Sequence, residues 1–156
     1  MTRVYQGLGV SCMYPENWTV SEETEGERVT GFMLESPTSA YMTVVEYPWT
    51  VPPREAVEKA REAMEQEYEE TEYLEREPEL KYRGERIADC RGADLHFYYL
   101  DLLVVSRLVS FTLQRKTYLV QMQAEDRDFQ SLEAVFQAML ISMIRSLESS
   151  QDTIND

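Results

Sequence analysis

The chain has 156 residues, of which 43% are hydrophobic, and it carries a net charge of −14. Its length and apolar content fit a single folded domain and exclude a disordered protein. The acidity argues against binding to nucleic acids or anionic membranes, because both depend on Lys and Arg to neutralise phosphates. We therefore expect no nucleic-acid partner and no membrane insertion. A basic or amphipathic protein partner fits this charge, and so does acidity that serves only solubility.

The N-terminus and the cysteines favour a cytoplasmic protein. Residues 1–6 lack the apolar segment of a signal peptide, and no apolar run reaches the ~18–20 residues that a membrane span requires. Cys12 and Cys90 are the only cysteines, and neither lies in a CxxC or metal-binding spacing. Cys12 lies in a mostly apolar run, where a free thiol behaves as a small hydrophobic group. The redox state of the two thiols is left open.

Short strands and polar turns fill the first third of the chain. A strand over Gly9–Met13 is followed by a turn at Pro15–Asn17, and Trp18 begins the strand that returns from this turn. We expect Trp18 to be buried near the turn. Two further strands follow, over about Arg28–Glu35 and Tyr41–Tyr47, which makes about four strands in a meander.

A helix is predicted from about Pro53 to Glu70, because proline is tolerated in a first helical turn and apolar residues recur at helical spacing. The outer face of this helix is acidic. The segment Glu55–Glu85 carries twelve carboxylates against five basic residues, which is half of the net charge. The helix face around Glu58, Glu62 and Glu69 is one candidate contact surface. The apolar stripe consists of Val57, Ala60, Met64 and Tyr68.

The middle of the chain is the least regular part. Thr71–Tyr82 contains the pair Glu77-Pro78, which disfavours a continuous helix, so we expect either a charged edge strand or an irregular connection. Glu85–Cys90 has the composition of a further strand, and Arg91-Gly92 is interpreted as a break or bulge after it.

Two long strands and one amphipathic helix close the domain. Ala93–Tyr99 pairs with Leu102–Gln114 through a short turn near Leu100-Asp101, and a second turn at Arg115-Lys116 leads into the next strand. From Asp128 the period becomes helical, with one apolar stripe: Phe129, Leu132, Phe136, Met139, Leu140, Met143 and Leu147.

These patterns predict the α+β class, an antiparallel sheet of about six to seven strands flanked by helices. We expect a single domain over residues 1–148. Residues 149–156 are polar and are predicted to be a disordered tail.

Few residues offer reactive chemistry. His96 is the only histidine, and it shares a strand face with Asp94, so the two could supply half of a zinc site, although no spacing nominates further ligands. Glu125, Asp126 and Asp128 lie where a helix begins, and capping explains them better than a calcium loop does. The sequence contains no Gly-rich nucleotide loop and no G-x-S-x-G elbow. We expect neither an enzyme nor a cofactor.

The turn around Leu100 is apolar and aromatic, whereas most hairpin turns are polar. Either this segment folds back under the helices, or it projects an apolar patch that would mark a contact site. Tyrosine is favoured at interfaces because its ring is apolar and its hydroxyl accepts water. The candidate protein-contact residues in this segment are Tyr98, Tyr99, Leu100, Leu102 and Leu103.

The opening segment Gly9–Trp18, with Tyr14-Pro15, two residues and then Trp, resembles the start of proteins of the PsbP-like superfamily. The order of later features agrees over about residues 7–147: a turn at Leu34–Pro37, a strand into Pro48, a helix from Pro53, long strands and a closing helix. The resemblance implies a PsbP-like α/β/α sandwich. It also implies a non-enzymatic protein that acts through protein contacts, as most members do. Members include a photosystem II extrinsic subunit, a Ran-binding nuclear-import factor and the DcrB-like proteins with the EagR chaperones.

Three functional hypotheses follow. The first is a non-catalytic, cytoplasmic protein-interaction module that acts through Tyr98–Leu103 or the acidic helix face. The second is an EagR- or DcrB-like chaperone that shields apolar helices of a secreted protein, with a homodimeric state and an exposed groove. That groove would be lined by Met42, Val44, Val104 and Leu108. The third is a metal-dependent enzyme that uses Asp94 and His96. The first two require a protein partner, whose identity the sequence leaves open.

Overall fold

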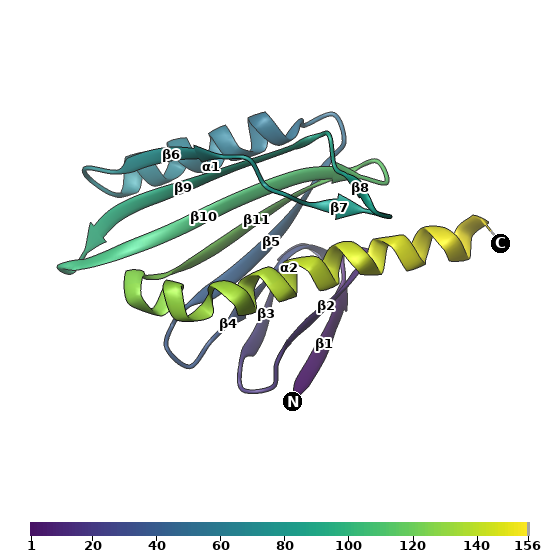
Figure 1. Cartoon of the computed structure of the whole chain (residues 1–156), viewed down its shortest axis with the longest axis horizontal. Coiled ribbons are helices and arrows are strands. Elements are labelled where there is room, and N and C mark those ends of the chain that lie inside the picture. Colours follow the sequence, from purple (N-terminus) through teal and green to yellow (C-terminus); the bar gives the residue numbers. More distant parts are fainter. Residues whose placement is uncertain (156) are drawn as a thin grey trace.

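Seven strands of the computed structural model form one antiparallel sheet with a helix on each face (Figure 1). The structure describes the backbone of residues 1–155 and the side chains as far as residue 149. The helices are α1 (Pro53–Glu67) and α2 (Asp126–Asn155). Across the sheet the strands are β3 (Thr19–Glu25), β4 (Arg28–Glu35), β5 (Tyr41–Pro48), β11 (Lys116–Glu125), β10 (Leu102–Leu113), β9 (Cys90–Tyr99) and β6 (Glu72–Arg76). Two short hairpins lie outside this sheet: β1 (Thr2–Gly7) with β2 (Val10–Pro15), and β7 (Lys81–Tyr82) with β8 (Glu85–Arg86). The predicted α+β sandwich is confirmed.

The larger core lies between the sheet and α2. Alternate side chains of β10 and β11 face this helix, because successive residues of a strand point to opposite faces. The carboxylate of Glu125 accepts hydrogen bonds from the N–H groups of Arg127 and Asp128, both at 3.1 Å, so it caps α2. Six of the seven residues of the predicted stripe are buried: Phe129, Phe136, Met139, Leu140, Met143 and Leu147.

A thinner core lies under α1, on the other face. Ala56, Val57 and Met64 pack against residues of β9, β10 and β11 there. The helix begins at Pro53, as predicted, but it ends at Glu67. Tyr68 is extended, with φ −118° and ψ 143°, and its ring stacks on Phe97 at 4.0 Å between centroids.

The N-terminal hairpin is the main difference from the expected fold. Five strands, rather than four, precede α1, and β2 pairs with β1 instead of with the strand that follows Trp18. The free edge of β2 is taken by α2, since the N–H groups of Ser11 and Met13 donate to the hydroxyls of Ser146 and Ser142 at 2.9 Å. The strand after Trp18 is β3, which pairs with β4 at the edge of the main sheet.

Strand β9 runs without interruption from Cys90 to Tyr99, so the predicted break at Arg91-Gly92 is wrong. Gly92 is buried, and a Cβ there would lie 2.8 Å from Cγ of Pro78. Glycine at this position therefore allows the chain after β6 to pass closely over β9. Of the strand expected at Glu85–Cys90, only Glu85–Arg86 forms a separate strand, β8. For Thr71–Tyr82 we expected a charged edge strand or an irregular connection, and β6 is that edge strand.

The groove expected for a chaperone is absent from the described residues. Met42, Val44 and Leu108 are fully buried. The first two belong to the core under α2, whereas Leu108 belongs to the core under α1, so they lie on opposite faces of the sheet. They cannot line one exposed surface, and this prediction is wrong.

The C-terminal part of α2 includes residues 149–155, within the segment predicted to be a tail. Side chains from residue 150 onward lie outside the described residues. The division between a domain of residues 1–148 and a disordered tail therefore stays a prediction. Within the described residues, neither helix combines the length and the apolar character needed to span a bilayer.

The central packing of α2 depends on Phe136, which is 1% exposed and lies between the rings of Trp18 and Phe129. Replacing Phe136 with Ala should lower the free energy of unfolding by about 3–5 kcal/mol, because it removes buried surface and leaves a cavity. Gln137→Ala, on the exposed side of the same turn, is the control and should change it by less than about 0.5 kcal/mol. Urea unfolding measures both. Equal effects of the two substitutions would contradict the packing.

The two tryptophans differ in environment. Trp18 is 6% exposed, and Trp49 is 53% exposed. In a Trp49→Phe variant, the remaining fluorescence should be blue-shifted and resistant to iodide, because a buried indole is shielded from water and from the anion. Solvent-like, fully quenchable emission would show that Trp18 is not packed against Phe136.

Candidate functional site

The β9–β10 hairpin projects large apolar side chains into solvent. Tyr98 is 66%, Tyr99 55%, Leu100 79% and Leu102 54% exposed, whereas Leu103 is half-buried. The hairpin turn therefore projects an apolar patch into solvent and does not fold back under the helices. Tyr99 and Leu102 are direct partners on the α1 side of the sheet, and Tyr98 and Leu103 are direct partners on the α2 side.

The exposure follows from a difference in length. A 12-residue strand such as β10 spans roughly 40 Å, whereas a 15-residue helix such as α1 spans roughly 22 Å. α2 starts directly after β11 and runs away from the hairpin tip (Figure 1). Neither helix therefore covers Leu100 and its neighbours.

The turn at this tip has an unusual first residue. Leu100 and Asp101 have φ values of 51° and 64°, a conformation that favours Asn and Gly and disfavours leucine. Three other two-residue turns, Leu8-Gly9, Arg83-Gly84 and Gln114-Arg115, also have two successive positive φ values, and each uses its first side chain structurally. The guanidinium of Arg83 donates a hydrogen bond to the carbonyl oxygen of Glu148 at 3.1 Å. Leu8 packs against the core, and Gln114 donates a hydrogen bond to the carbonyl oxygen of Leu147 at 2.6 Å. Leu100 has no comparable role among the described residues.

Aromatic side chains continue from the tip toward the end of α1. Tyr68 lies edge-on to Tyr99 at 6.1 Å between ring centroids while it stacks on Phe97. Burial raises the pKa of the nearby Tyr41 to about 12, and the Tyr68 hydroxyl contributes to this rise. The sequence pattern places Tyr68 on the buried stripe of the helix and gives no signal that it joins the exposed tip.

The glutamates predicted as a second contact surface do not form one site with the tip. Glu58, Glu62 and Glu69 are all exposed. Glu69 follows Tyr68 directly and therefore lies near the hairpin. Glu58 precedes Tyr68 by ten residues, which is roughly 15 Å along the helix. Glu62 precedes Tyr68 by six residues, which is roughly 9 Å along the helix, so only Glu69 of the three adjoins Tyr68.

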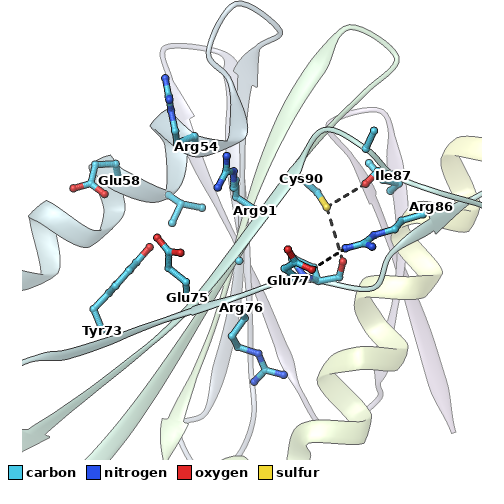
Figure 2. A pocket seen from close by; sticks show the side chains of 14 residues that line it. Arg54, Glu58, Tyr73, Glu75, Arg76, Glu77, Arg86, Ile87, Cys90 and Arg91 are labelled. Carbon is cyan, nitrogen blue, oxygen red and sulfur yellow. Dashed lines mark hydrogen bonds and ion pairs between the residues drawn. The ribbon is translucent and has the colours of Figure 1, made fainter.

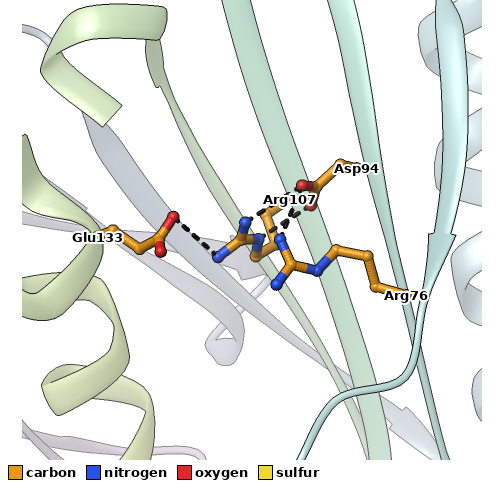
Figure 3. A network of polar contacts seen from close by, with 4 residues as sticks. All are labelled: Arg76, Asp94, Arg107 and Glu133. Atoms are coloured by element: carbon orange, nitrogen blue, oxygen red, sulfur yellow. Dashed lines mark hydrogen bonds and ion pairs between the residues drawn. The ribbon is translucent and has the colours of Figure 1, made fainter. Parts of the chain in front are cut away.

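The Asp94 carboxylate is part of an ion-pair network under α2 (Figure 3). It is 5% exposed, and its oxygens accept from the guanidinium of Arg76 at 2.9 Å and from that of Arg107 at 2.9 and 3.2 Å. Arg107 also pairs with Glu133 of α2 at 3.5 Å and lies over the ring of Phe129. Burial raises the pKa of Asp94, and the charge of Arg76 opposes this change.

This network bears on the metal hypothesis. Asp94 and His96 do share a face of β9, as expected, but both Asp94 oxygens accept hydrogen bonds from arginines. In the part of the chain that the structure describes, no group of three or more His, Cys, Asp or Glu side chains is placed to hold a metal ion. Asp94 is therefore engaged as the buried partner of Arg107, which in turn pairs with Glu133 of α2.

An open pocket of about 840 Å³ lies between α1, β6 and the start of β9 (Figure 2). Arg86 pairs there with Glu77 at 3.4 Å. Burial raises the pKa of the Cys90 thiol, which disfavours the reactive thiolate. Positive and negative groups balance, so the pocket does not select a ligand by charge: Arg54, Arg86 and Arg91 lie opposite Glu58, Glu75 and Glu77. The side chain of Arg76 points away from the pocket, toward Asp94 (Figure 2).

Removing one member of the Asp94 network should destabilise the fold. Asp94→Ala leaves the largely buried guanidinium of Arg107 without its main partner, which should lower the free energy of unfolding by about 3 kcal/mol. The double variant Asp94→Leu with Arg107→Met should regain most of this loss, because no buried charge is left unpaired. Urea unfolding compares the variants. A loss below about 1 kcal/mol in Asp94→Ala would contradict the role of Asp94 as the main partner of a buried Arg107.

Two solved structures share this fold over most of both chains. Cyanobacterial PsbP (CyanoP) from Synechocystis sp. PCC 6803 is similar with a TM-score of 0.62 at 9% identity, over 90% of each chain. The Ran-binding protein Mog1p from Saccharomyces cerevisiae is similar with a TM-score of 0.58 at 12% identity, over 96% of this chain and 97% of that one. No protein-family model matches the sequence, and a search of curated proteins finds no match. At these identities the likeness concerns the fold alone, and the chain has the PsbP-like fold that its opening segment indicated.

Proposed function

We propose that this protein is a non-catalytic, cytoplasmic protein-interaction module, and that it binds its partner through the tip of the β9–β10 hairpin. The observation that carries the proposal is the exposure of Tyr98, Tyr99, Leu100 and Leu102 at one point of the surface. Scattered exposed apolar residues are normal, but four neighbours on one projecting turn form a patch. Such patches on soluble proteins are typical of contact sites.

The conformation of Leu100 supports this role. A leucine with positive φ costs the fold free energy, and burial of its side chain would offset that cost, as at Leu8. Leu100 is instead 79% exposed. A leucine side chain at this position therefore destabilises the turn and gains no burial in the core that would offset this cost. Burial against a partner would supply the missing stabilisation.

The likeness to Mog1p is consistent with the proposal, since that protein binds Ran. The argument from fold is an analogy only, because one fold serves many functions. The acidity of the chain supports a protein partner over nucleic acid or an anionic membrane. The buried positions of Met42 and Leu108 remove the groove on which the chaperone hypothesis depended.

A capture experiment tests the proposal. The tagged protein should retain a partner from lysate of its source organism, and Tyr99→Ala with Leu102→Ser should lose it, because both changes remove apolar surface from the patch. Trp49→Ala is the matched control. Trp49 is also an exposed aromatic residue, but it lies next to the strand end where Pro48 pairs with Lys116, far from the tip.

Mass spectrometry reads the captured proteins. A partner held by the wild type and by Trp49→Ala, and lost from the hairpin variant, is the expected result. A partner lost equally from both variants, or held equally by all three proteins, would contradict a contact surface at the hairpin.

A further inference from the structure

We infer that the hairpin tip binds a basic amphipathic segment of another protein, one that presents apolar side chains flanked by Lys or Arg. This inference rests on the proposed function and adds the chemical class of the partner. It depends on which charges surround the exposed apolar residues, and on which of those charges already have a structural role.

The apolar part of the surface is larger than the turn. Tyr99 and Leu102 are on the α1 side of the sheet, and Tyr68 extends the same surface toward the end of α1. We call Tyr68, Tyr99 and Leu102 the aromatic ledge. Its three side chains come from β9, from β10 and from the residue that follows α1, so the fold gives the ledge the rigid support that a binding surface needs.

Carboxylates border this ledge where α1 ends. Glu67, Glu69 and Glu70 are exposed and flank Tyr68 in the sequence. Glu72 begins β6 opposite His96, three residues from Tyr99. Within the described residues, none of these four glutamates forms an ion pair, although Glu67 contacts the hydroxyl of Tyr68. By contrast, Glu55 and Glu65 of α1 pair with Lys59 and Arg61.

The helix itself adds to the negative potential. The C-terminus of a helix carries a partial negative charge, and Lys or Arg in the last turn usually complements it. α1 has no basic residue in its last turn and ends at Glu67. A cation supplied by a partner would therefore relieve repulsion that the isolated chain leaves uncompensated.

The acidic residues on the other side of the hairpin differ, because they are engaged in the fold. Val104 is opposite Glu125, so the start of α2 also lies near the tip. Glu125 caps α2, Asp126 accepts a hydrogen bond from Gln130, and Asp128 accepts one from Thr38. Glu67 contacts the hydroxyl of Tyr68, whereas Glu69, Glu70 and Glu72 have no such partner in the described residues. These three carboxylates place the cationic part of the ligand beside the aromatic ledge.

A second copy of this chain would bring like charges together at the same place, since every copy carries the glutamates around Tyr68 and a net charge of −14. Nucleic acids are excluded by the same repulsion. A basic amphipathic polypeptide satisfies both the apolar ledge and its acidic border.

The test uses a fluorescent Leu/Lys peptide patterned as an amphipathic helix, and the same peptide with Glu in place of Lys. The full chain should bind the Leu/Lys peptide and not the Leu/Glu peptide. Tyr99→Ala with Leu102→Ser should weaken binding about tenfold or more, which is the size expected when interface anchors are truncated. Glu69→Gln with Glu70→Gln should weaken it about threefold and reduce its salt dependence.

The matched control is Glu58→Gln with Glu62→Gln, which removes the same charge from α1 at a distance from the ledge and should change binding less than about twofold. Circular dichroism melts confirm that each variant is folded. Equal weakening by the near and distant glutamate pairs would overturn the inference, because the peptide would then respond only to the overall negative charge. Binding of the Leu/Glu peptide would also overturn it, because the peptide would then be held by apolar contacts alone.

The two experiments together distinguish a wrong partner class from a wrong proposed function. If the protein captures a partner through the hairpin but does not bind the Leu/Lys peptide, the partner class is wrong and the proposed function is not affected. Loss of neither the partner nor the peptide in the hairpin variant would overturn both.

Discussion

The mismatch in length between the central strands and the helix that covers them decides which surface of this protein is free. β9 and β10 are long enough to give α1 and α2 a complete sheet face each, and they continue beyond the end of α1. The hairpin tip is therefore exposed by the architecture. What the architecture does not require is that Tyr98, Tyr99, Leu100 and Leu102 occupy it, because a polar turn such as Asn-Gly would close the same hairpin with less strain.

The charges of the chain are divided in the same way between structure and surface. Asp94, Arg107 and Glu133 join the sheet to α2, and two serines of α2 hold the edge of β2. These polar contacts add to the apolar packing that holds α2 over the sheet. The carboxylates that follow α1 make no comparable contact in the described residues and lie beside exposed aromatic rings. A charge without an internal partner beside an exposed apolar patch is the arrangement expected of a surface that serves an external partner.

Much of the fold was accessible from the sequence because its central elements have clear periods. The apolar stripe of α2 is confirmed at every position except Leu132, which is half-buried. β10 and β11 are confirmed as strands, although residues on both of their faces are buried. β1 was missed because most of its side chains are exposed, and its pairing depends on a turn and on contacts with α2 that are distant in sequence. Gly92 was misread because a glycine in a strand signals either a break or a close approach of two chain segments, and only the position of Pro78 decides between them. For the candidate site, the apolar turn was visible, but the addition of Tyr68 required the tertiary contact with Tyr99.

The central claim is that the exposed hairpin residues serve contact rather than folding, and Leu100→Asn tests it most directly. Asparagine tolerates the positive φ of this position, so the free energy of unfolding in urea should rise by about 0.5–1 kcal/mol while capture of the partner falls. Leu8→Asn is the control, because Leu8 has the same conformation but packs against the core, and its replacement should lower stability. A loss of stability in Leu100→Asn, or unchanged capture of the partner, would contradict the account.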